Sequence, residues 1–256
     1  MKKHISAQPS HYNKEADHYD AFNEERSRII NQTIEFILKK YHLKAVLDLT
    51  CGTGSQVFWL INKGFIVTGS DINTKMLSIA KKKAQKQNIK VSLIKGDMRT
   101  SVLGSFDAVI TIFNAIGHLT QLDFEKAMCT IHANLNDNGI YIFDIFNLQY
   151  LMHGNNITAL TIDWQTITDN SKVRNIQYST IDITGVLASY DITYEQKGSN
   201  APTIKRSSMT LQVYSAEQLK EMLARNGFNA LEIMGVDGSV FDPIASERML
   251  VVAQKI

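Results

Sequence analysis

The sequence is poor in cysteine and has no long apolar run. Its 256 residues include two cysteines, Cys51 and Cys129, which are too few for a disulfide framework or a metal-ligand cluster. No stretch approaches the roughly 20 apolar residues that cross a bilayer, and the N-terminal residues are not followed by the apolar run of a secretory signal. We therefore expect a cytoplasmic protein with no membrane partner and no metal.

The chain also lacks a strong excess of either charge. Its 27 Lys and Arg residues against 25 Asp and Glu residues give a formal net charge of +2. Nucleic-acid binders usually carry a marked basic excess, so we expect no nucleic-acid partner. The lysine cluster at 81–86 lies near the end of a predicted helix, where positive charge is favourable. A hydrophobic content of 44% is ordinary for a globular protein.

Short β-branched runs alternate with helical patterns through the first half of the chain, which is typical of a parallel α/β sheet. A turn at 136–139 precedes the predicted fifth strand. The predicted strands are 45–49, 65–69, 90–94, 106–112, 140–143, 230–235 and 248–253. The predicted helices centre on 30–38, 57–64, 73–84, 124–135 and 215–227.

A different pattern occupies residues 150–212, where apolar and polar residues alternate at 176–180, 190–194 and 209–213. We interpret this segment as an antiparallel β-sheet inserted into a core formed by 1–149 and 213–256. Open α/β sheets bind ligands at the carboxyl ends of their strands, so the insertion is placed to shape the site of a second substrate. The alternative is a dimerisation surface, which would make the protein a homo-oligomer.

A glycine-containing turn follows the first predicted strand. Gly52 and Gly54 lack Cβ, which allows a sharp turn and the close approach of a ligand to the backbone. Asp71 ends the second strand 19 residues after Gly52, near the spacing of about 20 expected for an acid that binds ribose hydroxyls. Asp97 and Met98 follow the third strand, where they offer an acceptor and an apolar contact to an adenine ring.

The same layout would suit a nicotinamide cofactor. A dinucleotide fingerprint needs a third Gly or Ala under the pyrophosphate, and Val57 occupies that position here. A second acid at the next strand end therefore favours S-adenosylmethionine over NAD. Asp71 or Asp97 alone would be equally consistent with a helix cap or a turn.

The segment Val46-Leu47-Asp48-Leu49-Thr50-Cys51-Gly52-Thr53-Gly54 resembles motif I of the class I S-adenosylmethionine-dependent methyltransferases. Within them the chain is most similar to the glycine N-methyltransferase and amino-sugar N,N-dimethyltransferase group, through 26–28, 106–110, 114–119 and 147–151. The resemblance covers most of residues 12–150. It implies a Rossmann-like, mostly parallel seven-stranded sheet of order 3-2-1-4-5-7-6 with helices on both faces.

The resemblance also implies the residues of the S-adenosylmethionine site. Arg28 would pair with the methionine carboxylate, and Tyr12, in a mobile N-terminal segment, would close near the sulfonium. Asp71 would bind the ribose, and Asp97 with Met98 the adenine. The implied set is Tyr12, Arg28, Asp48, Thr50, Gly52, Gly54, Asp71, Ile72, Asp97, Met98, Ile112 and His118. The alternative for Arg28 is a surface ion pair on its helix.

Two residues after the fourth strand are candidates for catalysis. His118 could take the proton of an amine acceptor, or it could be a structural histidine; Asn114 could orient the acceptor or cap the turn. Phe146 stands where glycine N-methyltransferases place an arginine for the substrate carboxylate. We therefore expect a small-molecule acceptor other than glycine: an amine, an amino sugar or a hydroxylated metabolite.

Rival functions make distinct predictions. A nucleic-acid amino-methyltransferase would carry a Pro-Pro-aromatic motif after the fourth strand, and Phe113-Asn114-Ala115-Ile116 has no proline. A non-catalytic cofactor-binding scaffold would bind S-adenosylmethionine without turnover. An NAD-dependent oxidoreductase would bind NADH instead.

Overall fold

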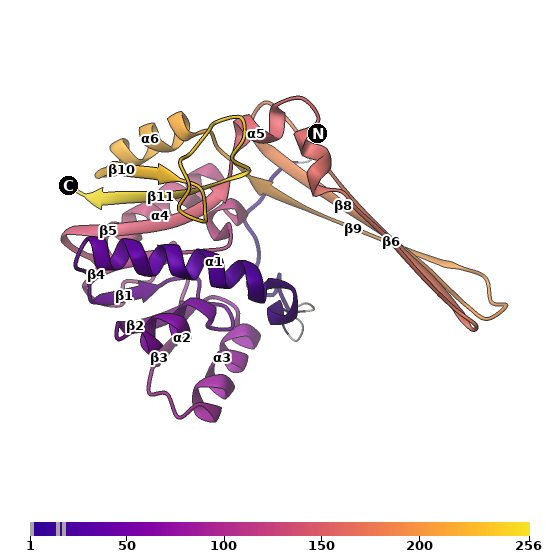
Figure 1. Cartoon of the computed structure of the whole chain (residues 1–256), viewed down its shortest axis with the longest axis horizontal. Coiled ribbons are helices and arrows are strands. Elements are labelled where there is room, and N and C mark those ends of the chain that lie inside the picture. The colour runs from indigo at the N-terminus through magenta and orange to yellow at the C-terminus, as the bar shows by residue number, and fades with distance from the viewer. Residues whose placement is uncertain (1–2, 14–15, 17–18) are drawn as a thin grey trace.

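The computed structural model describes residues 3–13, 16 and 19–256, with the backbone alone for 21–26. Its main sheet has seven strands in the order β10-β11-β5-β4-β1-β2-β3 (Figure 1). Strands β1 to β5 run parallel, and β11 and β10 complete the sheet in antiparallel fashion. The strands are β1 (Ala45–Asp48), β2 (Ile66–Asp71), β3 (Ser92–Lys95), β4 (Phe106–Thr111), β5 (Leu135–Phe146), β10 (Phe228–Met234) and β11 (Arg248–Lys255). The predicted order is confirmed.

Helices cover both faces of this sheet. Helices α4 and α6 pack on one face through residues such as Phe124 and Leu223, whereas α1, α2 and α3 pack on the other through residues such as Ile37, Leu60 and Leu77 (Figure 1). No described helix is long and apolar enough to cross a membrane. The helices are α1 (Tyr19–Lys40), α2 (Ser55–Asn62), α3 (Thr74–Lys86), η1 (Ala115–His118), α4 (Gln121–Asn134), α5 (Leu148–Met152), η2 (Asn156–Leu160) and α6 (Ala216–Arg225).

The insertion is a separate antiparallel sheet of order β6-β7-β8-β9. It projects from the carboxyl edge of the main sheet as a long arm (Figure 1), and an apolar cluster around Leu148, Leu187 and Val213 anchors its base. The sequence pattern predicted three strands here, and the structure adds the fully exposed β6. The strands are β6 (Ile162–Thr168), β7 (Ser171–Ile181), β8 (Val186–Lys197) and β9 (Thr203–Gln212).

One predicted boundary was wrong. The expected turn at 136–139 lies inside β5, which already pairs with β4 at Leu135 and accommodates a positive φ of 60° at Asn138. Helix α1 begins at Tyr19, well before the apolar pattern that predicted it, and the Asp20 carboxylate in its first turn binds partners beyond the helix. It accepts a hydrogen bond from the Thr53 hydroxyl at 2.6 Å and forms an ion pair with Lys83 at 2.5 Å.

Candidate functional site

The turn between β1 and α2 requires its glycines. Gly52 and Gly54 have φ angles of +52° and +93°, a region that L side chains rarely adopt. A Cβ on Gly54, the N-cap of α2, would also lie 2.5 Å from the ring of Phe58. The turn is tied to β2 because the Cys51 amide donates to the Ser70 carbonyl at 2.9 Å.

Asp71, the last residue of β2, connects this turn to the next helix. Its carboxylate accepts hydrogen bonds from the backbone amides of Gly52 at 2.8 Å and Asn73 at 2.7 Å. Burial raises the pKa of Asp71, although the backbone hydrogen bonds oppose that rise. The carboxylate is therefore fixed in place while one side of it faces a cavity.

Asp97 lies at the end of the neighbouring strand β3. Its carboxylate holds the guanidinium of Arg99 through two atoms, Nε at 2.9 Å and Nη2 at 2.6 Å. Burial alone would raise the pKa of Asp97, but the hydrogen bonds from Arg99 outweigh it and lower the pKa. A ligand that binds Asp97 therefore meets an anion that Arg99 already orients.

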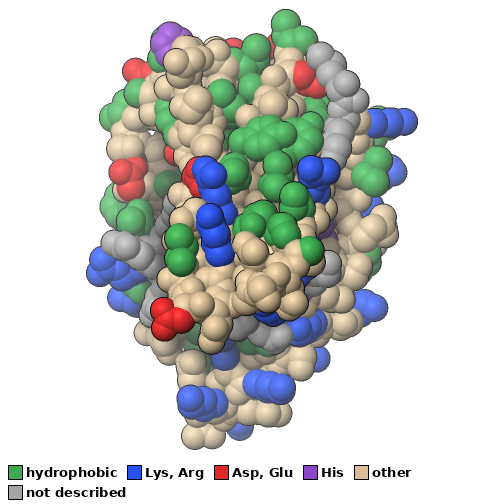
Figure 2. Space-filling view, turned by 90° about the vertical axis from the view of Figure 1, so that its right-hand side faces the viewer, with side chains coloured by type: hydrophobic (Ala, Val, Ile, Leu, Met, Phe, Trp, Pro, Cys, Tyr) green, Lys and Arg blue, Asp and Glu red, His purple; other side chains and the backbone are tan. Residues whose placement is uncertain are grey.

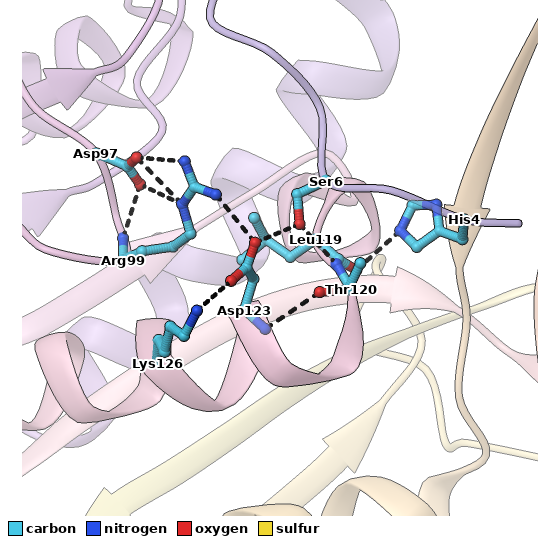
Figure 3. Close-up of polar contacts among 8 residues, drawn as sticks. All are labelled: His4, Ser6, Asp97, Arg99, Leu119, Thr120, Asp123 and Lys126. Atoms are coloured by element: carbon cyan, nitrogen blue, oxygen red, sulfur yellow. Dashed lines mark hydrogen bonds and ion pairs between the residues drawn. The ribbon is translucent and has the colours of Figure 1, made fainter.

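Residues 3–13 form an N-terminal strap that crosses over the cavity. Its central anchor is Ser6, whose hydroxyl donates to Asp123 at 2.6 Å and accepts from the Thr120 amide at 3.0 Å (Figure 3). Asp123 also accepts from Arg99 at 3.0 Å. One chain of charged hydrogen bonds therefore joins the strap to Asp97.

Further contacts hold the strap on either side of Ser6. The ring of the buried His4 lies 3.0 Å from the Leu119 carbonyl and 2.9 Å from the Thr210 hydroxyl on the arm. The Ala7 amide donates to the His118 carbonyl at 2.9 Å. The segment predicted to close over the cofactor is thus docked on both the core and the arm.

His118 lies beneath the strap. Its Nε2 atom is 2.7 Å from the hydroxyl oxygen of Tyr12, and the His11 ring packs against it edge-on. Burial, with smaller effects from His11 and His4, lowers the pKa of His118 to about 4. The imidazole is therefore neutral at physiological pH.

One cavity brings most of the predicted cofactor residues together, from the ends of β1, β2, β3 and β4 and from the strap. The predicted residues that line it are Tyr12, Thr50, Gly52, Asp71, Ile72, Asp97, Met98, Ile112 and His118. Arg28, by contrast, is exposed on α1 and is not among the lining residues. Gly54, the N-cap of α2, shapes the turn but does not line the cavity.

Asp48 lies buried behind the glycine turn. Its Oδ1 accepts from the Thr50 amide at 3.2 Å, whereas its Oδ2 and the Thr50 hydroxyl have no hydrogen-bond partner among the described residues. Burial, reinforced by the charge of Asp71, raises the pKa of Asp48 to about 8. Thr50 lines the cavity and Asp48 lies behind it, so a ligand that brings hydrogen-bond donors to this end of the cavity would match the two oxygens.

Asn114 supports the site without lining the cavity. It is buried in a left-handed conformation, its side-chain oxygen accepts from the Phe146 amide at 3.1 Å, and its own amide donates to Asp144 at 3.2 Å. The structure therefore uses Asn114 to tie the end of β4 to the end of β5. That Asn114 also orients an acceptor stays a prediction.

Several residues that line the cavity were not predicted from the sequence. Arg99 had a usable signal, since an arginine two positions after Asp97 can close on that carboxylate. Tyr19 had none, because the start of α1 precedes the helical pattern; burial raises its pKa to about 12. The further lining residues are Ala7, Gln8, Pro9, His11, Leu49, Asn73, Met76, Gly96, Phe113, Ala115 and Leu119.

Similar proteins point to one class of enzyme. Residues 46–139 match the sequence profile of the methyltransferase domain. A Geobacillus sp. (strain WCH70) protein provisionally named a methyltransferase is 26% identical over 217 residues, which cover 83% of this chain and 85% of that protein. Homo sapiens glycine N-methyltransferase is 28% identical over 133 residues, 45% of each chain. The Streptomyces fradiae dTDP-3-amino-3,6-dideoxy-alpha-D-glucopyranose N,N-dimethyltransferase is 31% identical over 112 residues, 42% of each chain.

Solved structures show the same architecture. An S-adenosylmethionine-dependent methyltransferase from Clostridium acetobutylicum ATCC 824 superposes with a TM-score of 0.74 at 20% identity, covering 95% of this chain and 98% of that one. The fold predicted from the resemblance is thus confirmed, and the methyltransferase profile covers the glycine turn and the predicted segments 106–110 and 114–119.

Proposed function

We propose that this chain, which belongs to the S-adenosylmethionine-dependent methyltransferases, methylates a nitrogen atom of a small amine. The observation that carries the cofactor site is that Gly52, Asp71 and Asp97, from three neighbouring strand ends, line one cavity. In this proposal the Asp71 carboxylate binds the ribose hydroxyls, and Asp97 with Met98 binds the adenine.

In the same proposal, the ammonium group on the methionine portion of S-adenosylmethionine donates hydrogen bonds to Asp48 and Thr50. These residues hold the two buried oxygens that have no partner among the described residues, and an ammonium group would satisfy both. When bound, S-adenosylmethionine supplies an electrophilic methyl group on a positively charged sulfur. The neutral amine contributes the electron pair of the new C–N bond as the C–S bond breaks, and the methylated nitrogen then releases its proton to water.

The chain contributes alignment and the exclusion of water. Displacement needs the nucleophile in line with the methyl carbon, and transfer from a cation is favoured where water is scarce. The strap covers the cavity with His11 and Tyr12. We further propose that the insertion, residues 150–212, closes the acceptor side, since Thr210 on the arm holds the strap through His4.

His118 is better suited to positioning the reacting groups than to acting as a general base. A pKa of about 4 makes its imidazole a weak base towards an alkylammonium, whose ordinary pKa resembles the roughly 10.4 of lysine. Its neutral ring can hold the Tyr12 hydroxyl at 2.7 Å over the cavity. We therefore assign His118 and Tyr12 the orientation of the reacting groups, and the acceptor enters as the free amine.

The acceptor class follows from two considerations. Relatives named for glycine and amino-sugar N-methylation make nitrogen the expected nucleophile. Phe146 stands where glycine N-methyltransferases place an arginine, and Asp144 neutralises the nearby Arg248, which argues against glycine itself.

The test is a panel of amines and alcohols, incubated with the protein and S-adenosylmethionine, with S-adenosylhomocysteine formation as the readout. Turnover of at least one amine, at a rate that rises with pH as the amine loses its proton, is the expected result. Cofactor binding without turnover across the panel would instead identify a scaffold. Binding of NADH in place of S-adenosylmethionine would identify an oxidoreductase.

A further inference from the structure

Arg248 and Asp144 form a buried ion pair at the carboxyl edge of the sheet. Arg248, the first residue of β11, pairs in register with Phe146, the last residue of β5. Its guanidinium donates to the Asp144 carboxylate, and its central carbon lies 5.2 Å from the centroid of the Phe146 ring. The aspartate side chain is fully buried, whereas that of the arginine is 18% exposed.

The Arg248 guanidinium has N–H groups that Asp144 does not engage. Arginine carries five N–H groups in a rigid fork, and Asp144 engages the Nη2 end. The Nε atom is buried and has no hydrogen-bond partner among the described residues. Leaving such a donor unsatisfied is costly, so a hydrogen-bond acceptor on a ligand that reaches the guanidinium would be stabilised there.

The pair adjoins the cavity on the side of Tyr19 and Phe113. Phe113 lines the cavity, and the next residue in the chain donates its amide to Asp144 at 3.2 Å. Tyr19 also lines the cavity, and the charges of both Asp144 and Arg248 act on its hydroxyl. A molecule that extends from the cavity past Tyr19 therefore approaches the guanidinium.

We infer that Arg248 determines acceptor specificity by donating hydrogen bonds to an uncharged oxygen of the methyl acceptor, and that Asp144 positions it. Asp144 already balances the arginine's charge, so the pair offers directed donors without a net positive field. That arrangement favours a hydroxyl or carbonyl oxygen over a carboxylate. The acceptor class is therefore a hydroxylated amine, an inference that rests on the proposed methyl transfer to nitrogen.

Three six-membered ring amines test this inference: glucosamine with hydroxyls, cyclohexylamine without oxygen, and 4-aminocyclohexanecarboxylate with an anion. For the wild type we expect kcat/KM to be highest for glucosamine. Arg248→Lys keeps the charge beside Asp144 but loses the fork. It should lower kcat/KM for glucosamine by about tenfold or more, mainly through KM, because a charge-assisted hydrogen bond is lost. Cyclohexylamine should be unaffected.

Two further variants separate specificity from folding. Asp144→Asn/Arg248→Met removes both charges together, which avoids an isolated buried charge and should abolish the preference for glucosamine. Arg225→Met removes an arginine that pairs with Glu125 at 3.0 Å on the surface and should change nothing. Thermal melts and S-adenosylhomocysteine affinity report on the fold and the cofactor site of each variant.

The inference is overturned if the wild type prefers the carboxylate or the plain ring, or if its preference survives Arg248→Lys. If no amine is methylated, the proposed methyl transfer is wrong, but the role of Arg248 in binding can still be tested. Saturation-transfer NMR of the three amines with the S-adenosylhomocysteine-loaded protein then still decides the role of Arg248. Glucosamine contacts in the wild type that vanish in the Arg248→Lys variant support it, and contacts that persist or never appear refute it.

Discussion

At the scale of single residues, the Asp71 carboxylate has a structural role and is proposed to bind the cofactor as well. Two backbone amides fix it, and it still faces the cavity. We expect Asp71→Ala to weaken S-adenosylmethionine binding by roughly 10- to 150-fold, as measured by calorimetric titration, because hydrogen bonds to a charged group contribute about 1.5–3 kcal/mol.

A matched control separates the two roles of Asp71. Asp107 also accepts from two backbone amides, those of Lys44 at 3.0 Å and Ala45 at 2.9 Å, but at the opposite end of the sheet. Asp107→Ala should lower thermal stability and leave cofactor affinity intact. Equal affinities in the wild type and the Asp71 variant would remove Asp71 from the binding site.

The ionisation of Asp48 should make the free energy of unfolding depend on pH. Its pKa is raised to about 8 in the folded chain by burial, compared with about 3.9 when unfolded. The folded state therefore binds an extra proton between these values, so this residue's contribution to the free energy of unfolding falls as pH rises from about 4 to 8. Asp48→Asn should remove that fall, which has a slope of up to about 1.4 kcal/mol per pH unit.

Urea denaturation at pH 5, 7 and 8 measures this difference. The variant should gain on the wild type steadily with pH, and cofactor affinity should drop because the amide nitrogen that replaces one Asp48 oxygen cannot accept a hydrogen bond from the ammonium group. Parallel stability profiles for the two proteins would mean that Asp48 ionises normally in the folded chain.

At the scale of elements, the strap couples the cofactor site to the arm. Ser6 is its central anchor, with contacts at 2.6 Å to Asp123 and 3.0 Å to Thr120 (Figure 3). We expect Ser6→Ala to speed hydrogen exchange of the Ala7 amide, which donates to His118, and to raise the dissociation rate of S-adenosylhomocysteine several-fold.

Thr158→Ala is the control for the strap experiment, because it removes a hydroxyl that caps an exposed turn at 2.6 Å. It should affect neither the exchange of Ala7 nor the release of the ligand. If Ser6→Ala also leaves both rates unchanged, the strap is held by its other contacts and does not control access.

Local sequence signals predicted the elements that depend on local chemistry. The glycine turn, the acids at the ends of β2 and β3, and the capping box of Ser215 and Gln218 on α6 are all read from short motifs, and the structure contains each of them. The packing of the strap and the pairing of Arg248 with Asp144 join residues over 100 positions apart, and no local pattern specifies such contacts.

At the scale of the whole molecule, the arm differs from the core in how it is stabilised. Strand β6 is exposed along its length, and Figure 2, which views the molecule from the arm's side, shows hydrophobic and basic side chains together on that face. Large exposed apolar residues of the arm are Ile162, Trp164, Ile167, Tyr178 and Ile204. The core strands, by contrast, are buried between two helical layers.

We therefore expect amide hydrogens in β6 and the outer half of β7 to exchange through local opening, at lower free energy than those of β1 and β4. Native-state hydrogen exchange monitored by NMR measures both. Protection of the arm equal to that of the core would contradict a free arm, and it is the result expected if a second copy of the chain covers it.

We propose above all that Gly52, Asp71 and Asp97 together bind one nucleoside. A crystal structure of the S-adenosylhomocysteine complex tests it most directly. We predict ribose hydroxyls on the Asp71 carboxylate, adenine beside Asp97 and Met98, and the amino-acid end above Asp48. The nucleoside bound elsewhere, or bound without contact to Asp71, would contradict the account.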